Sequence, residues 1–213
     1  MNSIDKLSEI FARFPGIGPR QAKRFVYFLL SRNGDYPSEL VRAIQSLKKE
    51  IIQCGECMRF FVYPDLSRAS SREHSRGAKL CSTCADETRD NSMLMIVPRD
   101  VDFEAVERSG SYNGRYFILG GVVPILEKEP EKRIRINELQ NLIDKKKSKL
   151  KEIVLAMNAN LDGENTAEFI KQKLIQGETL YTISTLGRGL STGAELEYAD
   201  PETLKNAFLH RTK

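Results

Sequence analysis

The four cysteines of the chain form two pairs, Cys54 with Cys57 and Cys81 with Cys84, and two residues separate the members of each pair. Two such knuckles are the usual way to build a tetrahedral site of four thiolates, the ligand set that zinc prefers. Gly55 suits the tight turn that the first knuckle requires. Because the protein would fill all four ligand positions, we expect a structural zinc ion that supports folding and offers no position to a substrate.

Two other chemistries fit four cysteines, namely two disulfides or a redox dithiol. A dithiol would explain one pair and leave the other idle. Disulfides require an oxidising compartment, whereas the absence of a long apolar run or a signal-peptide pattern favours the reducing cytosol. The segment between the pairs is polar and basic. Its His74 could replace one thiolate, although an exposed loop histidine is the simpler interpretation.

A second segment whose residues could bind a ligand runs from Phe14 to Arg24. It reads Phe-Pro-Gly-Ile-Gly-Pro-Arg-Gln-Ala-Lys-Arg. Glycine lets the backbone approach an anion closely, and proline is favoured at the first position of a helix. A helix start also attracts anions, because its free N–H groups point outward and its dipole adds positive charge. These features predict that the segment binds the phosphates of a nucleic acid without recognising the base sequence. The candidate residues are Gly16, Gly18, Arg20, Lys23 and Arg24.

Two helices should hold this turn in place. The first is expected at Ser3–Arg13, and the second should begin at Pro19. Apolar residues at helical spacing predict the buried positions. They are Leu7, Ile10, Phe11 and Phe14 before the turn, and Ala22, Phe25, Val26, Leu29 and Leu30 after it. The alternative is an ordinary helical hairpin with a glycine-rich turn and a solvated cationic face.

Charge is distributed unevenly along the 213 residues, which carry a formal net charge of +4. Basic residues dominate the first fifty positions, the segment between the cysteine pairs, and the stretch from Lys145 to Lys151. The last fifty residues are slightly acidic. This balance permits a nucleic-acid partner without requiring one.

From Met93 onward, short apolar runs alternate with helical patterns, which predicts a mostly parallel sheet with helices on both faces. The expected strands are Met93–Val97, Tyr116–Leu119, Ile153–Met157 and Leu180–Thr185. The expected helices are Asp102–Ser109, Asn137–Leu150 and Asn165–Ile175.

Acidic and amide residues follow two of these strands, at the sheet edge where such folds gather ligands. They are Asp100 and Asp102 after the first strand, and Asn158, Asn160, Asp162 and Glu164 after the third. The Toprim fold of topoisomerases and primases holds Mg²⁺ here with a glutamate and an Asp-x-Asp pair. This chain has Pro98 and Asn158-Ala159-Asn160 instead. Asparagine neither neutralises a cation nor accepts a proton at neutral pH. We therefore expect no catalytic residue, and Asp102 and Asp162 could cap helices instead.

The order of these parts resembles the RecR family of bacterial recombination mediators. The resemblance covers nearly the whole chain and is specific at residues 14–20, 158–167 and 187–200. Residues 109–117 also fit the family pattern. It implies a multidomain α plus α/β fold. The expected parts are a helix-hairpin-helix domain at 1–53, a four-cysteine zinc finger with an extended basic loop at 54–90, a Toprim-like domain at 91–186, and a C-terminal tail or assembly segment at 187–213.

RecR proteins are non-enzymatic, and the resemblance implies the same role here. They form a ring-like tetramer that can encircle DNA, and they act with RecO and RecF to load RecA at gaps during recombinational DNA repair. The resemblance therefore implies sequence-independent binding of single-stranded or duplex DNA through Arg20 and Arg24. It implies a surface for RecO and RecF that includes Asp102, Asp162 and Glu164, and a cytoplasmic, nucleoid-associated location in a bacterium.

The chain departs from the RecR pattern in three places. The finger is longer, Pro98 replaces a glutamate, and residues 122–130 replace a His-Leu-Ser-Pro loop and the glycine-rich turn after it. Two alternative functions stay open from the sequence. One is a Toprim-type, Mg²⁺-dependent nuclease or primase with a rearranged site. The other is a hub that binds only proteins and uses the hairpin to oligomerise.

Overall fold

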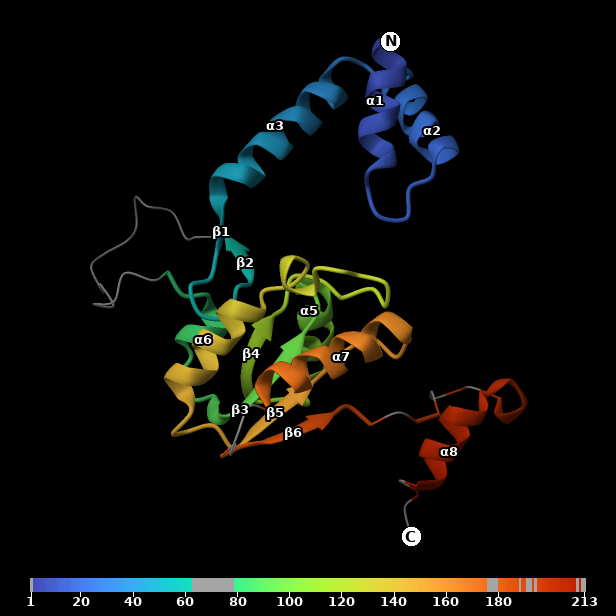
Figure 1. Cartoon of the computed structure of the whole chain (residues 1–213). Helices are drawn as coiled ribbons and strands as arrows, with labels where there is room; N and C mark the ends of the chain where they lie inside the picture. The colour runs from blue at the N-terminus through green and yellow to red at the C-terminus, as the bar shows by residue number, and fades with distance from the viewer. Residues whose placement is uncertain are drawn as a thin grey trace. The chain divides into compact units, whose positions relative to one another are not determined.

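The computed structural model describes residues 2–62, 79–175, 180–187, 189–190, 193, 195–209 and 211 (Figure 1). His74 and most of the expected basic loop of the finger lie outside these residues. The chain divides into two compact units, Met1–Ile52 and Gln53–Lys213. Among the described helices, none has the length and apolar character needed to cross a bilayer.

The first unit contains α1 (Ser3–Ala12), α2 (Pro19–Leu30) and α3 (Asp35–Glu50). α1 starts after Asn2, whose side chain accepts a hydrogen bond from the backbone N–H of Asp5 at 2.9 Å. α1 and α2 pack together, with the rings of Phe11 and Phe25 edge to face at 5.8 Å. As expected, α2 begins at Pro19 and buries Ala22 and Val26.

Several residues expected in the core of this unit lie at its surface. Ile10, Phe14 and Leu30 are 46%, 54% and 64% exposed. The reason is geometric, because two helices bury only the stripes that face each other. Helix α3, which the sequence analysis did not anticipate, likewise buries none of its residues within the chain, and its Val41 and Ile44 are exposed.

The second unit is built on a four-stranded parallel sheet in the order β4-β3-β5-β6. The strands are β3 (Asp90–Val97), β4 (Gly114–Ile118), β5 (Glu152–Leu155) and β6 (Thr182–Thr185). The helices of this unit are α4 (Ser82–Ala85), α5 (Asp100–Ser109), α6 (Ile136–Lys146), α7 (Leu161–Leu174) and α8 (Pro201–Leu209). Short 3-10 helices lie at Pro130–Lys132 and Leu196–Tyr198, and the short strands β1 (Ile51–Gln53) and β2 (Phe60–Val62) pair with each other.

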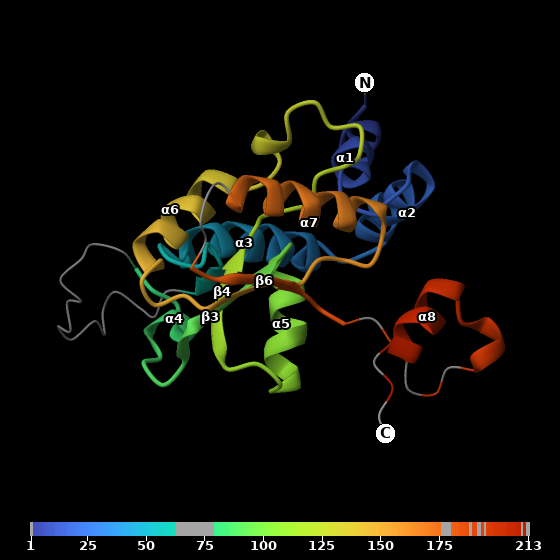
Figure 2. The same ribbon diagram turned by 60° about the horizontal axis from the view of Figure 1, so that its bottom comes forward.

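Each face of the parallel sheet has its own core, and Figure 2 shows α6 and α7 on one face and α4 and α5 on the other. Side chains alternate along a strand. Leu94 and Ile96 of β3 therefore pack with residues of α6 and α7, while Met95 and Val97 pack with Phe103 of α5. The four cysteines belong to this second core. The parallel sheet covered by helices on both faces confirms the expected fold class.

The positions of the predicted strands and helices are confirmed, but several boundaries shift. α6 ends at Lys146 rather than at Leu150, and α7 begins at Leu161 rather than at Asn165. β6 begins at Thr182 rather than at Leu180. The expected caps are wrong. Asp162 lies in the first turn of α7, and the residue that caps this helix is Asn160, whose side chain accepts from the N–H of Gly163. Asp102 likewise lies in the first turn of α5, after the cap position Arg99.

Candidate metal centre and nucleic-acid interface

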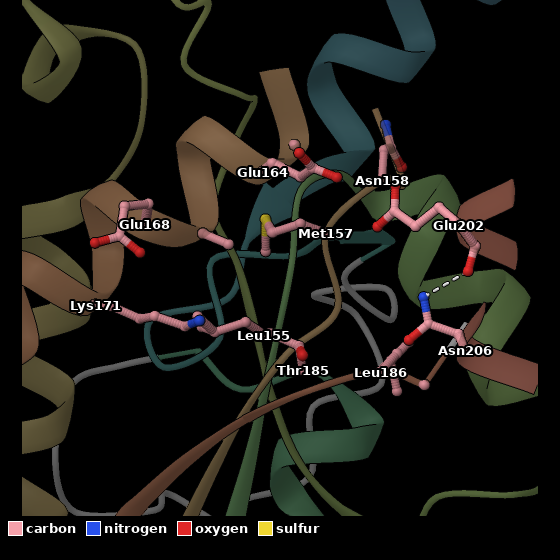
Figure 3. A pocket seen from close by; sticks show the side chains of 13 residues that line it. Leu155, Met157, Asn158, Glu164, Glu168, Lys171, Thr185, Leu186, Glu202 and Asn206 are labelled. Carbon is pink, nitrogen blue, oxygen red and sulfur yellow. Dashed lines mark hydrogen bonds between the residues drawn. The ribbon is translucent and has the colours of Figure 1, made fainter. Parts of the chain in front are cut away.

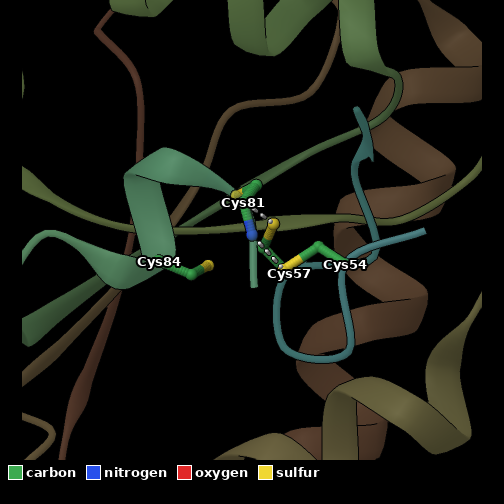
Figure 4. A group of neighbouring side chains, drawn as sticks. All are labelled: Cys54, Cys57, Cys81 and Cys84. Atoms are coloured by element: carbon green, nitrogen blue, oxygen red, sulfur yellow. Dashed lines mark hydrogen bonds between the residues drawn. The ribbon is translucent and has the colours of Figure 1, made fainter. Parts of the chain in front are cut away.

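The four cysteines meet in one buried cluster (Figure 4). Their sulfur atoms all lie within 4.8 Å of one another, and none of the four forms a disulfide. The Sγ atoms of Cys57 and Cys81 are 3.6 Å apart. A tetrahedral zinc site with Zn–S bonds of about 2.3 Å would separate its sulfurs by about 3.8 Å. The cluster therefore fits a metal ion held by four thiolates.

Without a cation, the thiols of this cluster share protons unequally. Hydrogen bonds from Cys57 and Cys81 lower the pKa of Cys54 far below its ordinary value. The same contacts raise the pKa values of Cys57 and Cys84, because each interacts with the sulfur of Cys54. A divalent cation at the centre would supply the positive charge needed to hold all four sulfurs as thiolates, and it would release their protons.

The first knuckle is a tight turn closed by backbone hydrogen bonds. The N–H of Met58 donates to the carbonyl of Cys54 at 3.2 Å, and the N–H of Cys54 donates to the carbonyl of Arg59 at 2.8 Å. Left-handed backbone is found at Met58, with φ of 63°, and not at Gly55. Gly55 lies within the turn, as expected, and Met58 takes the left-handed backbone that closes it.

The first knuckle also lies against the edge of the parallel sheet. The N–H of Ile118, at the end of edge strand β4, donates to the carbonyl of Cys57 at 2.8 Å. Cys81 precedes α4, and its N–H approaches the sulfur of Cys54 at 3.4 Å, which links the second knuckle to the first. The cysteine cluster thus covers part of an edge strand that would otherwise present unpaired backbone groups.

The turn between α1 and α2 has the geometry of an anion site. Gly16 has a φ of +77°, and open space surrounds the position of a Cβ at Gly16 and at Gly18. Gly18 is the cap residue of α2 and provides no side-chain cap, and the first turn of the helix holds no acidic residue. The N–H groups at the start of α2 therefore keep their capacity to bind an anion.

The three cations expected beside this turn are exposed. They are Arg20, Lys23 and Arg24, and no ion pair engages any of them within the part of the chain that the structure describes. Arg24 donates weakly to Gln21 at 3.4 Å, one helical turn away. Their charge is thus available to an external partner.

The expected acidic residues occupy the first turns of the helices that follow β3 and β5. Asp102 pairs with Arg99 at 3.2 Å, and Asp100 accepts the backbone N–H of Phe60 at 2.9 Å. Asp162 and Glu164 lie at the start of α7. Within the described residues, the four cysteines are the one group of histidine, cysteine or acidic side chains close enough to hold a metal.

A pocket of about 570 Å³ opens beyond the ends of β5 and β6 (Figure 3). Its lining includes three carboxylates and one cation, from Glu164, Glu168, Glu202 and Lys171. Asn158 also lines it, whereas Asp102 and Asp162 do not. Of the residues that the sequence analysis grouped at the degenerate Toprim site, only Asn158 and Glu164 line this pocket.

Two residues of α7 that bond to the segment at 122–130 were not anticipated by the sequence analysis. Thr166 is fully buried in α7, and its hydroxyl accepts the N–H of Val123 at 2.8 Å while donating to the carbonyl of Asp162 at 2.5 Å. Asn165 donates to the carbonyl of Val123 at 3.0 Å. These bonds fix the segment at 122–130, where the chain departs from the RecR pattern, against α7. Both residues belong to a polar run, residues 162–166, so the sequence carried no signal that Thr166 would be buried.

Comparison with known proteins agrees with this architecture. The Toprim domain family matches residues 92–184, the RecR helix-hairpin-helix family matches residues 4–48, and the RecR C-terminal family matches residues 189–212. The fold is therefore that of a Toprim protein that also carries a helix-hairpin-helix. Three similar proteins share the name recombination protein RecR. The one from Staphylococcus saprophyticus is 34% identical over 210 residues, which span 99% of this chain and 96% of the relative.

The other two are from Bifidobacterium adolescentis and Bdellovibrio bacteriovorus. The first is 34% identical over 210 residues, which span 98% of this chain and 95% of the relative. The second is 30% identical over 217 residues, which span 100% of this chain and 98% of the relative. The chain belongs to the RecR family.

Proposed function

We propose that this chain is a non-enzymatic mediator of recombinational DNA repair that binds the DNA backbone through the turn between α1 and α2. The observation that carries this proposal is the uncapped start of α2, bordered by the exposed cations Arg20, Lys23 and Arg24. Membership in the RecR family supports a role in recombination and repair. Contacts to phosphates predict binding that depends strongly on salt and little on base sequence.

The proposal includes the absence of catalytic activity on DNA. The side chain of Asn160 already accepts the N–H of Gly163 at 2.9 Å, and the carboxylate of Asp100 accepts the N–H of Phe60. Asn160 cannot act as a base or a charged ligand, and among the described residues no group of acidic side chains is close enough to hold a metal. We expect no cleavage, joining or primer synthesis on DNA with Mg²⁺ or Mn²⁺. Turnover that Asp162→Asn abolishes would instead establish the alternative of a nuclease or primase.

The metal and the partners complete the proposal. The ion is zinc, bound by Cys54, Cys57, Cys81 and Cys84, and it acts on folding rather than on a substrate. Copies of the chain form a ring-like tetramer that acts with RecO and RecF to load RecA at gaps in bacterial DNA. Asp102, Asp162 and Glu164 belong to the surface that these two partners contact. Elemental analysis should find about one zinc per chain, with less in Cys57→Ser.

The decisive experiment measures DNA affinity across salt concentrations by fluorescence anisotropy. Replacing Arg20 and Arg24 together by alanine should weaken binding. On single strands, the slope of log K against log salt should decrease by about 0.7 for each phosphate that is no longer neutralised. A matched control removes two charges elsewhere, with Arg108→Ala and Lys128→Ala. Equal slopes for the two double variants would exclude this turn as a DNA contact, and a wild-type protein that does not bind DNA would favour a hub that binds only proteins.

A further inference from the structure

Arg115 is a buried cation, and no carboxylate in the described part of the chain pairs with it. It lies in edge strand β4, is 8% exposed, and takes part in no ion pair with any described residue. A buried charge is costly unless its hydrogen bonds are made. Hydrogen bonds to neutral acceptors reduce the free energy of burying this guanidinium. It donates to Asn91 Oδ1 at 2.9 Å and to the carbonyls of Thr83 and Cys84 at 3.1 Å each.

Two of these three acceptors belong to the second cysteine knuckle, and one is the carbonyl of the last cysteine in the cluster. A divalent ion with four thiolates carries a net charge of two minus, which a nearby guanidinium offsets. We propose that Arg115 is a positioning residue for the metal centre, which rests on the proposed zinc site. It fixes Cys84 against the sheet and stabilises the charge of the four-thiolate complex.

A second arginine, Arg89, provides a matched comparison. Its side chain is also largely buried, and it also bonds to β4, donating to the carbonyl of Gly114 at 3.2 Å. Unlike Arg115, it forms ion pairs, with Glu107 and, at 3.8 Å, with Asp86. The carbonyls that Arg115 binds in the second knuckle are not its acceptors. Replacing Arg89 should affect the fold of this region without acting directly on the metal.

The test compares zinc release in Arg115→Met, Arg115→Lys and Arg89→Met. The full-length proteins are loaded with zinc, transfer to a coloured chelator gives the release rate and affinity, and thermal melting gives stability. Groups that support metal ligands contribute about 10-fold to 100-fold in metal affinity. We expect a loss of that size in Arg115→Met, a smaller loss in Arg115→Lys, which keeps the charge, and unchanged affinity in Arg89→Met.

A spectroscopic readout separates positioning from general stability. The cobalt-substituted protein should show altered d–d bands in both Arg115 variants and unaltered bands in Arg89→Met. If Arg115→Met does not fold, Arg115→Lys still decides the matter through its release rate and its cobalt spectrum. Wild-type release and spectra in Arg115→Lys, or equal zinc losses in Arg115→Met and Arg89→Met, would overturn the assignment.

A different observation concerns residues 144–151, here called the lysine loop, which comprise the end of α6 and the connection from it to β5. Residues 144–151 contain five lysines and one aspartate, so their excess of four positive charges equals the net charge of the whole chain. Lys146 pairs with Glu56. The side chains of the remaining lysines, Lys145, Lys147, Lys149 and Lys151, are exposed.

The backbone of this lysine loop is held at both ends. The N–H of Lys149 donates to the carbonyl of Lys146 at 2.9 Å, and that of Lys151 donates to the carbonyl of Ser92 at 2.8 Å. Leu150, which is 3% exposed, anchors the loop in the core. The loop lies at the amino end of β5, whereas the acidic residues follow the carboxyl ends of the strands.

We infer that the lysine loop is a second contact for the DNA backbone, which rests on the proposed function. Exposed lysines on a fixed loop match the repeated charge of phosphates, and the apolar residue among them is buried rather than offered to a partner. Because lysine acts as a point charge, the contact should not depend on base sequence.

The test replaces Lys147, Lys149 and Lys151 together by glutamine in the full chain. The control replaces Lys128, Lys132 and Lys205 by glutamine, which removes the same charge. In the loop variant alone, the salt slope on single-stranded DNA should fall by about 0.7 for each phosphate that its lysines no longer neutralise. Equal slopes for both triple variants would refute the loop contact, and an intact effect of the arginine double variant would then leave the proposed function standing.

Discussion

Gly163 lies in the first turn of α7, where an alanine should destabilise the protein. A Cβ at this position would lie 2.0 Å from the carbonyl oxygen and 2.9 Å from the carbonyl carbon of Asn158. Both are backbone atoms of the loop after β5, so relief requires the loop or the helix to move. Helix propensity favours alanine by about 1 kcal/mol, whereas overpacking costs about 1–3 kcal/mol. So short a contact corresponds to the upper end of that range.

We therefore expect Gly163→Ala to lower the free energy of unfolding by about 2 kcal/mol, after the gain in helix propensity is subtracted. For a chain of this length, that loss corresponds to a fall in Tm of about 4–8 °C, measured by circular dichroism. Gly34→Ala is the matched control, because Gly34 precedes α3 with a φ of −55° and open space around its Cβ position. A Gly163→Ala protein that melts at or above the wild-type temperature would refute the reasoning.

Three further outcomes are expected. Thr166→Val should cost about 1–3 kcal/mol in urea denaturation, because the buried N–H of Val123 loses its acceptor, whereas Thr166→Ser should be nearly neutral; equal losses would contradict this role. Asn160→Ala should cost about 1 kcal/mol through removal of the helix cap, and Asn160→Asp should melt like the wild type; an alanine variant as stable as the aspartate variant would exclude the cap. Finally, all four cysteines must lose a proton to act as thiolate ligands, so protons compete with the metal as pH falls. Metal content after dialysis should therefore decrease on acidification, and a constant content would contradict coordination by thiolates.

Features set by local sequence were predicted well. The apolar runs located β3, β4 and β5, because a strand buried on both faces is largely apolar. Edge strand β6 is partly exposed, and its predicted start was two residues early. The cysteine spacing predicted a four-thiolate cluster, because ligand spacing within a knuckle is a local property. Proline and glycine located the start of α2 for the same reason, since both act on their own backbone dihedrals.

Features set by tertiary packing were not predicted. Helical periodicity shows which face of a helix is apolar but not whether the chain covers it, so Ile10 and Phe14 were wrongly assigned to a core. The cap of α7 was placed at Asp162 because the sequence does not show where the helix begins. In the structure α7 begins at Leu161, after the cap residue Asn160. The burial of Arg115 and its hydrogen bonds to the second knuckle could not be predicted, because in the sequence it is only a charged residue beside an apolar run.

The position of the cysteine cluster at β4 affects what the protein becomes when it is stripped of metal. Edge strands with free backbone groups pair readily with strands of other molecules. The bond between Ile118 and Cys57 occupies that edge only while the knuckle keeps its shape. Removal of the metal by a chelator would therefore expose backbone groups of β4 as well as lower the stability of the protein. The metal-free protein would tend to form β-rich aggregates.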